Sequence, residues 1–287
     1  ESINLGKASR MNDAQGRYIE FCKSSFTDLD LNGLSILLDC ANGATYSVAP
    51  KVFSELGAKV ETIGSSPDGI NINQNCGSTN PNFLKEEIIK GSYDLGIAFD
   101  GDGDRILIVN SEGDILDGDD ILYILSNNLS VDSGVVGTLM TNKALEIYFE
   151  KNDIPFLRAD VGDKYVLQRL LEESWVLGGE PSGHIICLDS APTGDAIIAA
   201  LNLLDATKDN NFSVKKSLEG FKKFPQTLIN LKVNNPNKII VSDKFWSEVT
   251  RIEKQLGQNG RVLIRPSGTE PLIRLMVESD KSGASHD

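Results

Sequence analysis

Three carboxylates that alternate with glycines are the clearest candidates for chemistry in the chain. The run Asp100-Gly-Asp-Gly-Asp-Arg105 follows an apolar stretch, residues 95–99, with the composition of a buried strand. On a loop just past a strand, Asp100, Asp102 and Asp104 can converge on one point, where like charges about 5 Å apart repel by roughly 3 kcal/mol per pair. A divalent cation turns this repulsion into attraction, and all-oxygen ligands suit magnesium, calcium or manganese. The sequence therefore predicts a metal site here.

The same run has other interpretations. A solvated acidic turn is one, since Asp-Gly is common in turns. An EF-hand needs Gly and Glu where Arg105 and Ser111 stand, and a dinucleotide fingerprint needs a third Gly where Ile106 stands. A phosphatase of the haloacid dehalogenase type also places Asp-x-Asp after an apolar strand, with Asp100 as the nucleophile and Asp102 as the acid/base. That alternative stays open.

A second loop, residues 178–184, places Glu180, Ser182 and His184 on alternate positions between glycines. In an extended loop, alternate side chains point the same way. A carboxylate, a hydroxyl and an imidazole that can move a proton near neutral pH suit the hydroxyls or the amine of a sugar. The alternative is a turn at the entry to a strand with a structural histidine.

A third loop, Arg265-Pro-Ser-Gly-Thr-Glu-Pro271, has the residues of a phosphate site. Arg265 can bind a phosphate with two parallel hydrogen bonds, and Ser267 and Thr269 offer hydroxyls. Gly268 permits a positive φ, with which successive backbone N–H groups form an anion site. The alternative is a plain hairpin turn. Loops for a cation, a sugar and a phosphate together predict a sugar phosphate held between domains, with the metal assisting phosphoryl transfer.

Composition restricts the classes of partner. The 287 residues have a net charge of -13, which argues against binding to nucleic acid or to an anionic membrane. The mean hydropathy is -0.17, and no apolar run approaches the roughly 20 residues of a membrane span. Four scattered cysteines, without CxxC spacing, predict a reduced, cytoplasmic protein. The chain starts at Glu1 rather than Met, so we expect it to be part of a longer protein.

The elements that position these loops predict an α/β fold. We expect two consecutive α/β domains with mainly parallel sheets, followed by a small C-terminal α+β domain. The expected divisions are residues 1–105, ending in the metal loop, 106–222, with the sugar loop, and 223–287, with the phosphate loop and an incomplete C-terminus. A polar, lysine-rich linker is expected between residues 205 and 223. Thr193 is expected to cap a helix that runs to about Leu204.

The three motifs, in this order, resemble the metal, sugar and phosphate loops of the α-D-phosphohexomutases. Residues 13–20, 39–45 and 187–204 resemble the bacterial phosphoglucosamine mutase branch of that family. This resemblance implies a magnesium enzyme of amino sugar metabolism and peptidoglycan precursor supply. It would be an isomerase that interconverts glucosamine 6-phosphate and glucosamine 1-phosphate through a phosphoserine and a bisphosphate intermediate. Another phosphohexomutase, acting on mannose or glucose phosphates, and a non-catalytic sugar-phosphate-binding fragment are the alternatives.

The resemblance also assigns residues to roles. It implies that the metal ligands are Asp100, Asp102 and Asp104. It implies that Arg105 lies beside the phosphorylated nucleophile and that His184 lies near the acid/base position. The residues that it implies for substrate binding are Lys164, Glu180, Ser182, Arg265, Ser267, Gly268 and Thr269.

One family feature has no counterpart in the sequence. The family's first domain carries a phosphoserine, which is also a metal ligand, in a Thr-Ala-Ser-His-Asn-Pro-like loop, and Ser9 has no such context. We therefore expect a missing N-terminal domain to supply the phosphoserine, and the chain by itself to be inactive. Without that ligand and its charge of about -2, we expect millimolar magnesium affinity. The sequence leaves the oligomeric state open, a homodimer included.

Overall fold

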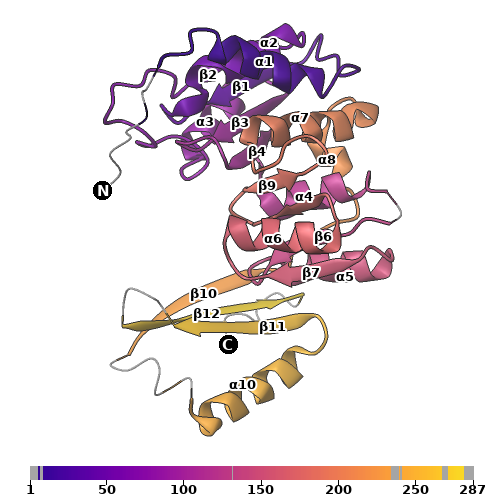
Figure 1. Ribbon diagram of the computed structural model, residues 1–287. Coiled ribbons are helices and arrows are strands. Elements are labelled where there is room, and N and C mark those ends of the chain that lie inside the picture. The colour runs from indigo at the N-terminus through magenta and orange to yellow at the C-terminus, as the bar shows by residue number, and fades with distance from the viewer. Residues whose placement is uncertain are drawn as a thin grey trace. The chain divides into compact units, whose positions relative to one another are not determined.

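Strand β3, which leads into the metal loop, is the central strand of a five-stranded sheet. The computed structural model (Figure 1) describes residues 6, 9–130, 132–233, 239, 241–266 and 271–280. The sheet has the order β2-β1-β3-β4-β5. Its strands are β1 (Ser35–Asp39), β2 (Lys59–Ile63), β3 (Leu95–Phe99), β4 (Ile106–Asn110) and β5 (Ile115–Leu116). All five residues of β3 are buried, as an apolar run flanked by helices requires.

This sheet is mixed rather than mainly parallel. β1 pairs in parallel with β2 and β3, whereas β3–β4 and β4–β5 are antiparallel. The sequence pattern predicted that residues 106–109 begin the second domain. That assignment was wrong, because the metal loop is short enough for β4 to return directly alongside β3. The predicted division after residue 222 stays a proposal.

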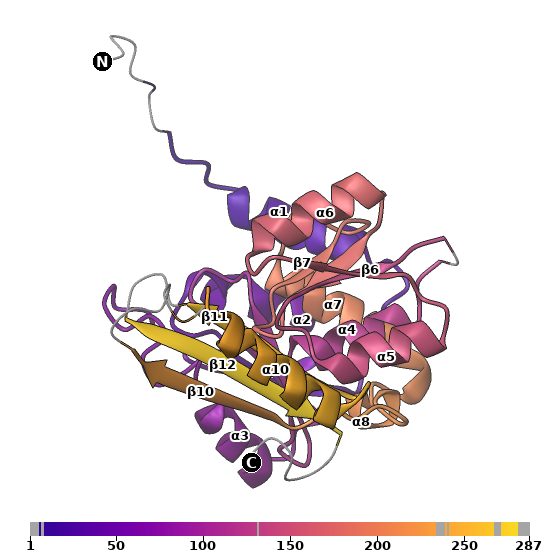
Figure 2. The ribbon, with the colours of Figure 1, turned by 90° about the horizontal axis from the view of Figure 1, so that it is seen from below.

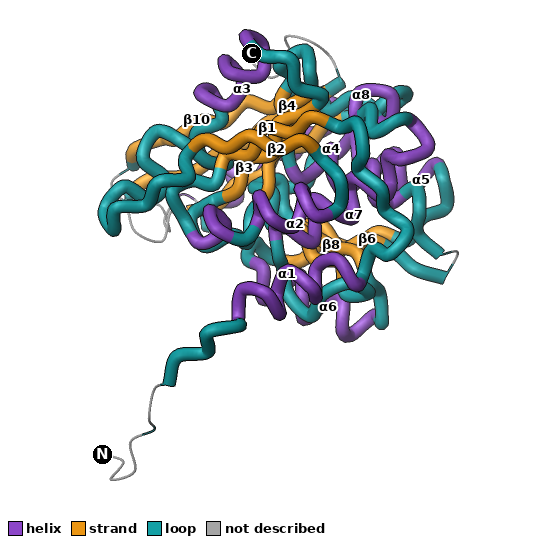
Figure 3. The backbone as a smooth tube through the Cα atoms, turned by 90° about the horizontal axis from the view of Figure 1, so that it is seen from above, coloured by secondary structure: helices purple, strands orange, loops and turns teal. Residues whose placement is uncertain are grey.

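Helices cover both faces of the first sheet. Helix α3 packs on one face, where Leu84 and Ile88 join Leu37, Ala98 and Val109 in an apolar cluster. Helices α1 and α2 lie on the other face, as Figure 3 shows. The helices of this unit are α1 (Ala14–Ser24), α2 (Ala49–Glu55), α3 (Asn82–Lys90) and α7 (Ala196–Thr207), with 3₁₀ turns at Ala44–Ser47 and Lys208–Asn210. The described residues of 1–117 and 182–214 make up this first compact unit.

Helix α7 begins later than expected. Asp195, not Thr193, is its N-cap, and the Asp195 carboxylate accepts hydrogen bonds from the backbone N–H groups of Ile197 (3.0 Å) and Ile198 (3.1 Å). Both residue types are good caps, so composition alone did not distinguish them. The helix packs against β4 and against β9 (Ile185–Cys187), which directly follows His184.

The described residues of 118–181 and 215–287 make up the second unit. Its α/β part has β6 (Val135–Thr138) in parallel with β7 (Phe156–Ala159) and β8 (Leu177–Gly179). The helices of this part are α4 (Gly118–Ser126), α5 (Lys143–Lys151) and α6 (Asp163–Glu173). This agrees with the predicted α/β fold. Asn142 caps α5 by accepting a hydrogen bond from Ala144 N–H at 3.0 Å.

A small antiparallel sheet ends the described chain, in the order β10-β12-β11, as expected for an α+β part. Its strands are β10 (Gln226–Lys232), β11 (Gly260–Pro266) and β12 (Leu272–Ser279). The amphipathic helix α10 (Asp243–Leu256) lies across one face of this sheet, as Figure 2 shows. Val249 and Leu256 are its buried residues.

The expected linker is ordered where it enters this small sheet. After α8 (Val214–Ser217), the Phe221 ring stacks on Tyr123 with centroids 4.4 Å apart, and Lys223 forms an ion pair with Asp120 at 2.6 Å. The Asn142 side chain exchanges two hydrogen bonds with the backbone of Phe224, at 3.1 and 3.0 Å. The polar, lysine-rich composition predicted a linker here, and the contacts of its last residues are with helices that are distant in the sequence. Within the described residues, no helix is long and apolar enough to cross a membrane.

Candidate functional site

The metal loop begins where the order of the strands reverses. The chain runs from β1 to β2 on one side and then to β3 on the other side of β1. In open α/β sheets, ligands bind beyond the carboxyl ends of the strands at such a switch point. Asp39 ends β1 and Asp100 follows the adjacent parallel strand β3. The metal loop therefore lies at the carboxyl edge of the sheet, where ligands bind in this class of fold.

Asp100 organises the loop that it begins. Its side chain is fully buried, and Oδ1 accepts hydrogen bonds from the backbone N–H groups of Gly103 (3.2 Å), Asp104 (3.1 Å) and Arg105 (3.0 Å). Its Oδ2 accepts a hydrogen bond from Arg105 Nε at 2.6 Å. These bonds curl the loop back on the strand end and explain why a buried carboxylate is tolerated there.

The three predicted metal ligands do converge. One oxygen from each of Asp100, Asp102 and Asp104 lies within 4.8 Å of the others. Asp102 is exposed and Asp104 is partly buried, so the cluster opens to solvent on one side. Three carboxylates with only oxygen donors fit a hard divalent cation.

The pKa values of Asp100 and Asp104 are shifted in opposite directions. Burial by itself would raise the pKa of Asp100, but hydrogen bonds from the Arg105 backbone and guanidinium outweigh it and lower that pKa. Burial, and then the neighbouring Asp100, raise the pKa of Asp104. For Arg105, burial would lower the pKa, but the bond to Asp100 raises it. The loop therefore holds Asp100 as a carboxylate.

His184 lies against the metal loop. Its Nδ1 is 3.0 Å from Asp104 Oδ2, and Ile106 N–H donates to the Gly183 carbonyl at 3.0 Å. The side chain is only 6% exposed. A Cβ atom on Gly194 would collide with Nε2, so glycine is required there for the ring to fit. His184 therefore orients Asp104, and its predicted acid/base role stays a prediction.

Helix α7 also docks on this loop. The N–H of Ala196, at the start of the helix, donates to the Gly103 carbonyl at 3.0 Å. Tyr18 donates to Asp195 Oδ2 at 2.7 Å and so links α1 to the same helix end. A helix N-terminus carries partial positive charge, which favours nearby carboxylates. A cavity of about 290 Å³ beside the loop is lined by Tyr18, Asp102, Asp104, Asp195 and others.

Two of the predicted sugar-binding residues, Glu180 and Lys164, lie in the second unit. Glu180 accepts a hydrogen bond from Gly162 N–H at 3.0 Å, which joins the sugar loop to the N-cap of helix α6. Lys164 is exposed, with its Nζ 4.7 Å from the centroid of the Tyr165 ring. Ser182 belongs to the first unit and is exposed. Its sugar contact stays a prediction, as do those of Glu180 and Lys164.

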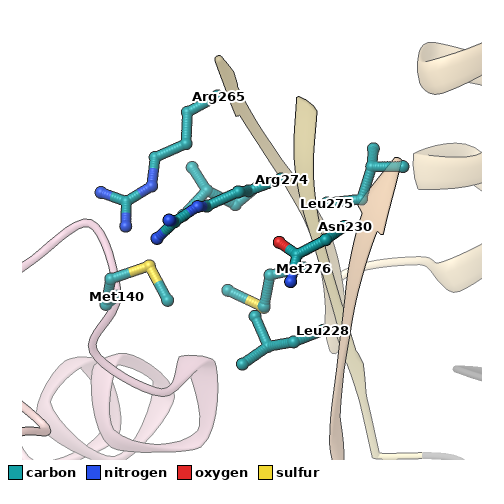
Figure 4. A pocket seen from close by; sticks show the side chains of 8 residues that line it. Met140, Leu228, Asn230, Arg265, Arg274, Leu275 and Met276 are labelled. Carbon is teal, nitrogen blue, oxygen red and sulfur yellow. The ribbon is translucent and has the colours of Figure 1, made fainter. Parts of the chain in front are cut away.

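Arg265 has a partner that the sequence analysis missed. It lies directly opposite Arg274 in the β11–β12 pair, and the two side chains extend the same way, toward the loop that carries Met140 (Figure 4). They line a cavity of about 260 Å³, together with Met140, Leu228, Asn230, Leu263, Leu275 and Met276. Ser267, Gly268 and Thr269 lie outside the described residues.

This pair of arginines is suited to an anion. Like charges directly opposite each other destabilise a sheet. In the described part of the chain, neither guanidinium has an acidic partner within ion-pair distance, so an anion between them would relieve the repulsion. The sequence contained both arginines, but only the register of β11 and β12 shows that they lie opposite each other.

Models of one family match nearly the whole chain, domain by domain. Residues 16–113 match phosphoglucomutase/phosphomannomutase α/β/α domain II, residues 117–224 match its α/β/α domain III, and residues 228–286 match its C-terminal domain. The matches are consecutive and in the family's order. The metal loop lies in the first, the segment 178–184 in the second and Arg265 in the third.

Curated relatives match over the same length. The phosphoglucosamine mutase of Pseudomonas aeruginosa strain UCBPP-PA14 is 50% identical over 99% of this chain and 65% of its own length. That of Acinetobacter baumannii strain AYE is 52% identical over 98% of this chain and 63% of its own. The chain thus spans slightly less than two thirds of these relatives.

Solved structures share the fold. A phosphoglucomutase/phosphomannomutase family protein from Burkholderia thailandensis superposes with a TM-score of 0.79 over 95% of this chain and 62% of its own, at 22% identity. Aspergillus fumigatus N-acetylphosphoglucosamine mutase does so with a TM-score of 0.77 over 95% of this chain and 68% of its own, at 20% identity. The chain therefore belongs to the phosphoglucomutase/phosphomannomutase family, the α-D-phosphohexomutases, and contains its domains II, III and IV.

Proposed function

We propose that the whole protein is a phosphoglucosamine mutase, an isomerase that interconverts glucosamine 6-phosphate and glucosamine 1-phosphate. The observation that carries this proposal is the identity of about 50% to curated phosphoglucosamine mutases over nearly the whole chain. The phosphoryl group would pass through a phosphoserine and a bisphosphate intermediate. That serine would come from a further domain of the whole protein, since the relatives are longer than this chain.

The metal is proposed to be Mg²⁺, held by Asp100, Asp102 and Asp104. The all-oxygen donor set supports this choice, and the A. fumigatus enzyme was crystallised with GlcNAc-6P and magnesium. When bound, the cation would supply positive charge to the phosphoryl group in transfer. The protein's own part is to keep Asp100 ionised through Arg105 and to hold Asp104 through His184.

Arg265 and Arg274 are proposed to bind the phosphate that does not react. Two planar guanidinium groups on adjacent strands can each form paired hydrogen bonds to phosphate oxygens, which fixes the substrate by its unreactive end. Ser267, Gly268 and Thr269 are proposed to complete this site. Glu180, Ser182 and Lys164 are proposed to contact the sugar, and Arg105 to lie beside the phosphorylated serine.

The direct test is phosphorus NMR on the whole protein purified from its own gene. We expect glucosamine 6-phosphate to give a glucosamine 1-phosphate signal when Mg²⁺ and a hexose bisphosphate activator are present, and not when EDTA is added. The same assay with glucose 6-phosphate and mannose 6-phosphate should run more slowly. Faster conversion of either would contradict the glucosamine assignment, and no conversion of any hexose phosphate would contradict the mutase itself.

A further inference from the structure

A second buried carboxylate lies near the metal loop without belonging to it. Asp39, the last residue of β1, is fully buried. Its Oδ1 accepts a hydrogen bond from Ala41 N–H at 3.0 Å and its Oδ2 from Gly77 N–H at 2.7 Å. No cation of the described chain pairs with it. Burying a carboxylate is costly, so a position that retains one calls for an explanation beyond packing.

The two bonds of Asp39 join two segments that are far apart in the chain. Ala41 belongs to the segment 40–45 after β1, and Gly77 belongs to the long loop 64–81 that follows β2. Further bonds fasten the same junction: Asn73 N–H donates to the Ala41 carbonyl at 2.8 Å, and Ser78 N–H donates to the Phe99 carbonyl at 2.8 Å. The loop 64–81 is thereby attached to the ends of both β1 and β3.

Both segments enclose the backbone of the metal loop at Gly101. From one side, Ala44 N–H donates to the Gly101 carbonyl at 2.8 Å, and Gly43 lies so close that no side chain would fit between them. From the other side, a Cβ atom on Gly101 would lie 2.6 Å from Ile72 Cδ1 and 2.7 Å from Asn73 Nδ2. Gly101 stands between Asp100 and Asp102, so its placement sets the direction of both side chains.

We propose that Asp39 is a positioning residue for the metal loop: its carboxylate fastens segment 40–45 to loop 64–81, and the two together fix Gly101. A carboxylate suits this task better than an amide, because each of its oxygens accepts one of the two N–H groups, whereas an amide would point its NH₂ group at one of them. The inference rests on the proposed metal site and adds a residue outside it. Residues that orient metal ligands commonly change metal affinity by 10- to 100-fold when replaced.

The test compares Asp39→Asn with the unchanged chain. Mn²⁺ binding is followed by electron paramagnetic resonance, and backbone order by hydrogen–deuterium exchange. We expect Asp39→Asn to weaken Mn²⁺ binding about tenfold or more and to speed exchange in residues 64–81 and 100–105. The matched control is Asp94→Asn, because Asp94 accepts Ser35 N–H at 2.7 Å at the opposite end of β1. This control should leave Mn²⁺ affinity unchanged.

A second variant keeps the test decisive if Asp39→Asn fails to fold. Ile72→Ala removes one wall of the Gly101 enclosure, and Ile72 is 54% exposed, so the core is not altered. It should weaken Mn²⁺ binding several-fold. A folded Asp39→Asn protein with unchanged exchange and Mn²⁺ affinity would overturn the inference, as would unchanged binding in Ile72→Ala. If the unaltered chain binds no Mn²⁺, the proposed metal site fails, while faster exchange of residues 100–105 in Asp39→Asn would still show that Asp39 orders this loop.

Discussion

At the scale of single residues, Arg274 is the clearest addition to the predicted site. It shares a cavity with Arg265 and has no acidic partner in the described part of the chain. Hydrogen bonds to charged groups contribute roughly 1.5–3 kcal/mol. We therefore expect Arg274→Ala to weaken the binding of glucosamine 6-phosphate by about 10- to 100-fold, measured by calorimetry.

Two further variants make this prediction specific. Arg274→Lys keeps the charge but loses the planar fork, so it should recover only part of the affinity. Arg251→Ala, on the exposed surface of α10, removes a positive charge from the same C-terminal part without touching the cavity, and should bind as the unaltered chain does. Equal losses in Arg251→Ala and Arg274→Ala would mean that overall charge, not a phosphate site, explains the effect.

Also at the scale of single residues, Glu146 makes the folding stability depend on pH. Burial would raise its pKa, but hydrogen bonds from Lys143 and Arg158 lower it. A lowered pKa in the folded state stabilises the protein above the unfolded-state pKa of about 4.3, and this stabilisation is lost as the pH falls through the folded-state pKa. Urea unfolding between about pH 6 and 3 should therefore show a smaller loss of stability for Glu146→Gln than for the unaltered chain.

A matched substitution on the same helix tests the assignment. Glu150 is exposed on α5 and has no ion pair with any described residue. Glu150→Gln should lose as much free energy of unfolding at acid pH as the unaltered chain does. If Glu146→Gln shows the same acid-dependent loss of stability, the ion pairs of Glu146 with Lys143 and Arg158 do not contribute to folding stability.

At the scale of elements, a buried glutamate ties the small C-terminal sheet to the rest of its unit. Glu278 on β12 is fully buried and accepts hydrogen bonds from Arg261 Nε (2.5 Å), Gln226 Nε2 (2.7 Å) and the backbone N–H of Lys143 (3.1 Å). Removing one partner of such a network leaves a buried charge uncompensated. We expect Glu278→Ala to lower the free energy of unfolding by about 3–5 kcal/mol in urea denaturation.

The comparison for this prediction is Glu248→Ala, which breaks an ion pair on the exposed face of α10. Surface pairs contribute about 0–1 kcal/mol, so that variant should unfold almost as the unaltered chain does. A cost below about 1 kcal/mol for Glu278→Ala would show that β12 and α5 are not held together by this network.

The elements themselves were largely predictable, because apolar periodicity and helix-capping residues are local signals. Residues 95–99, for example, form the buried strand that their apolar sequence indicates. The pairing of β4 with β3 was not predictable in this way, since strand pairing depends on contacts that periodicity does not encode. Arg274 was not predicted for the same reason, because only the pairing of β11 with β12 places it opposite Arg265. The burial of His184 against Asp104 was not predicted either, because its spacing in the loop suggested a side chain that faces a sugar.

At the scale of the whole molecule, the three loops occupy three successive family domains. The metal loop and His184 belong to the first compact unit, and Glu180 and Arg265 belong to the second. The metal loop is fixed within the first unit by Asp100 and α7, and Glu180 is fixed within the second by Gly162. We therefore expect the proposed metal binding and phosphate binding to be measurable on this chain independently of turnover.

This separation leads to a prediction about turnover. In the proposed mechanism the phosphoryl group would reside on a serine of a further domain, and the matched models are domains II, III and IV. The 287-residue chain should therefore bind glucosamine 6-phosphate, yet give no glucosamine 1-phosphate in the phosphorus NMR assay, even with a hexose bisphosphate present. The whole protein, assayed at the same concentration, should convert it. Turnover by a preparation of the chain that mass spectrometry shows to be free of the longer protein would contradict this. It would place the nucleophile within the chain and would favour Asp100 as a nucleophile of the phosphatase type. Trapping of beryllium fluoride on Asp100 would test that alternative.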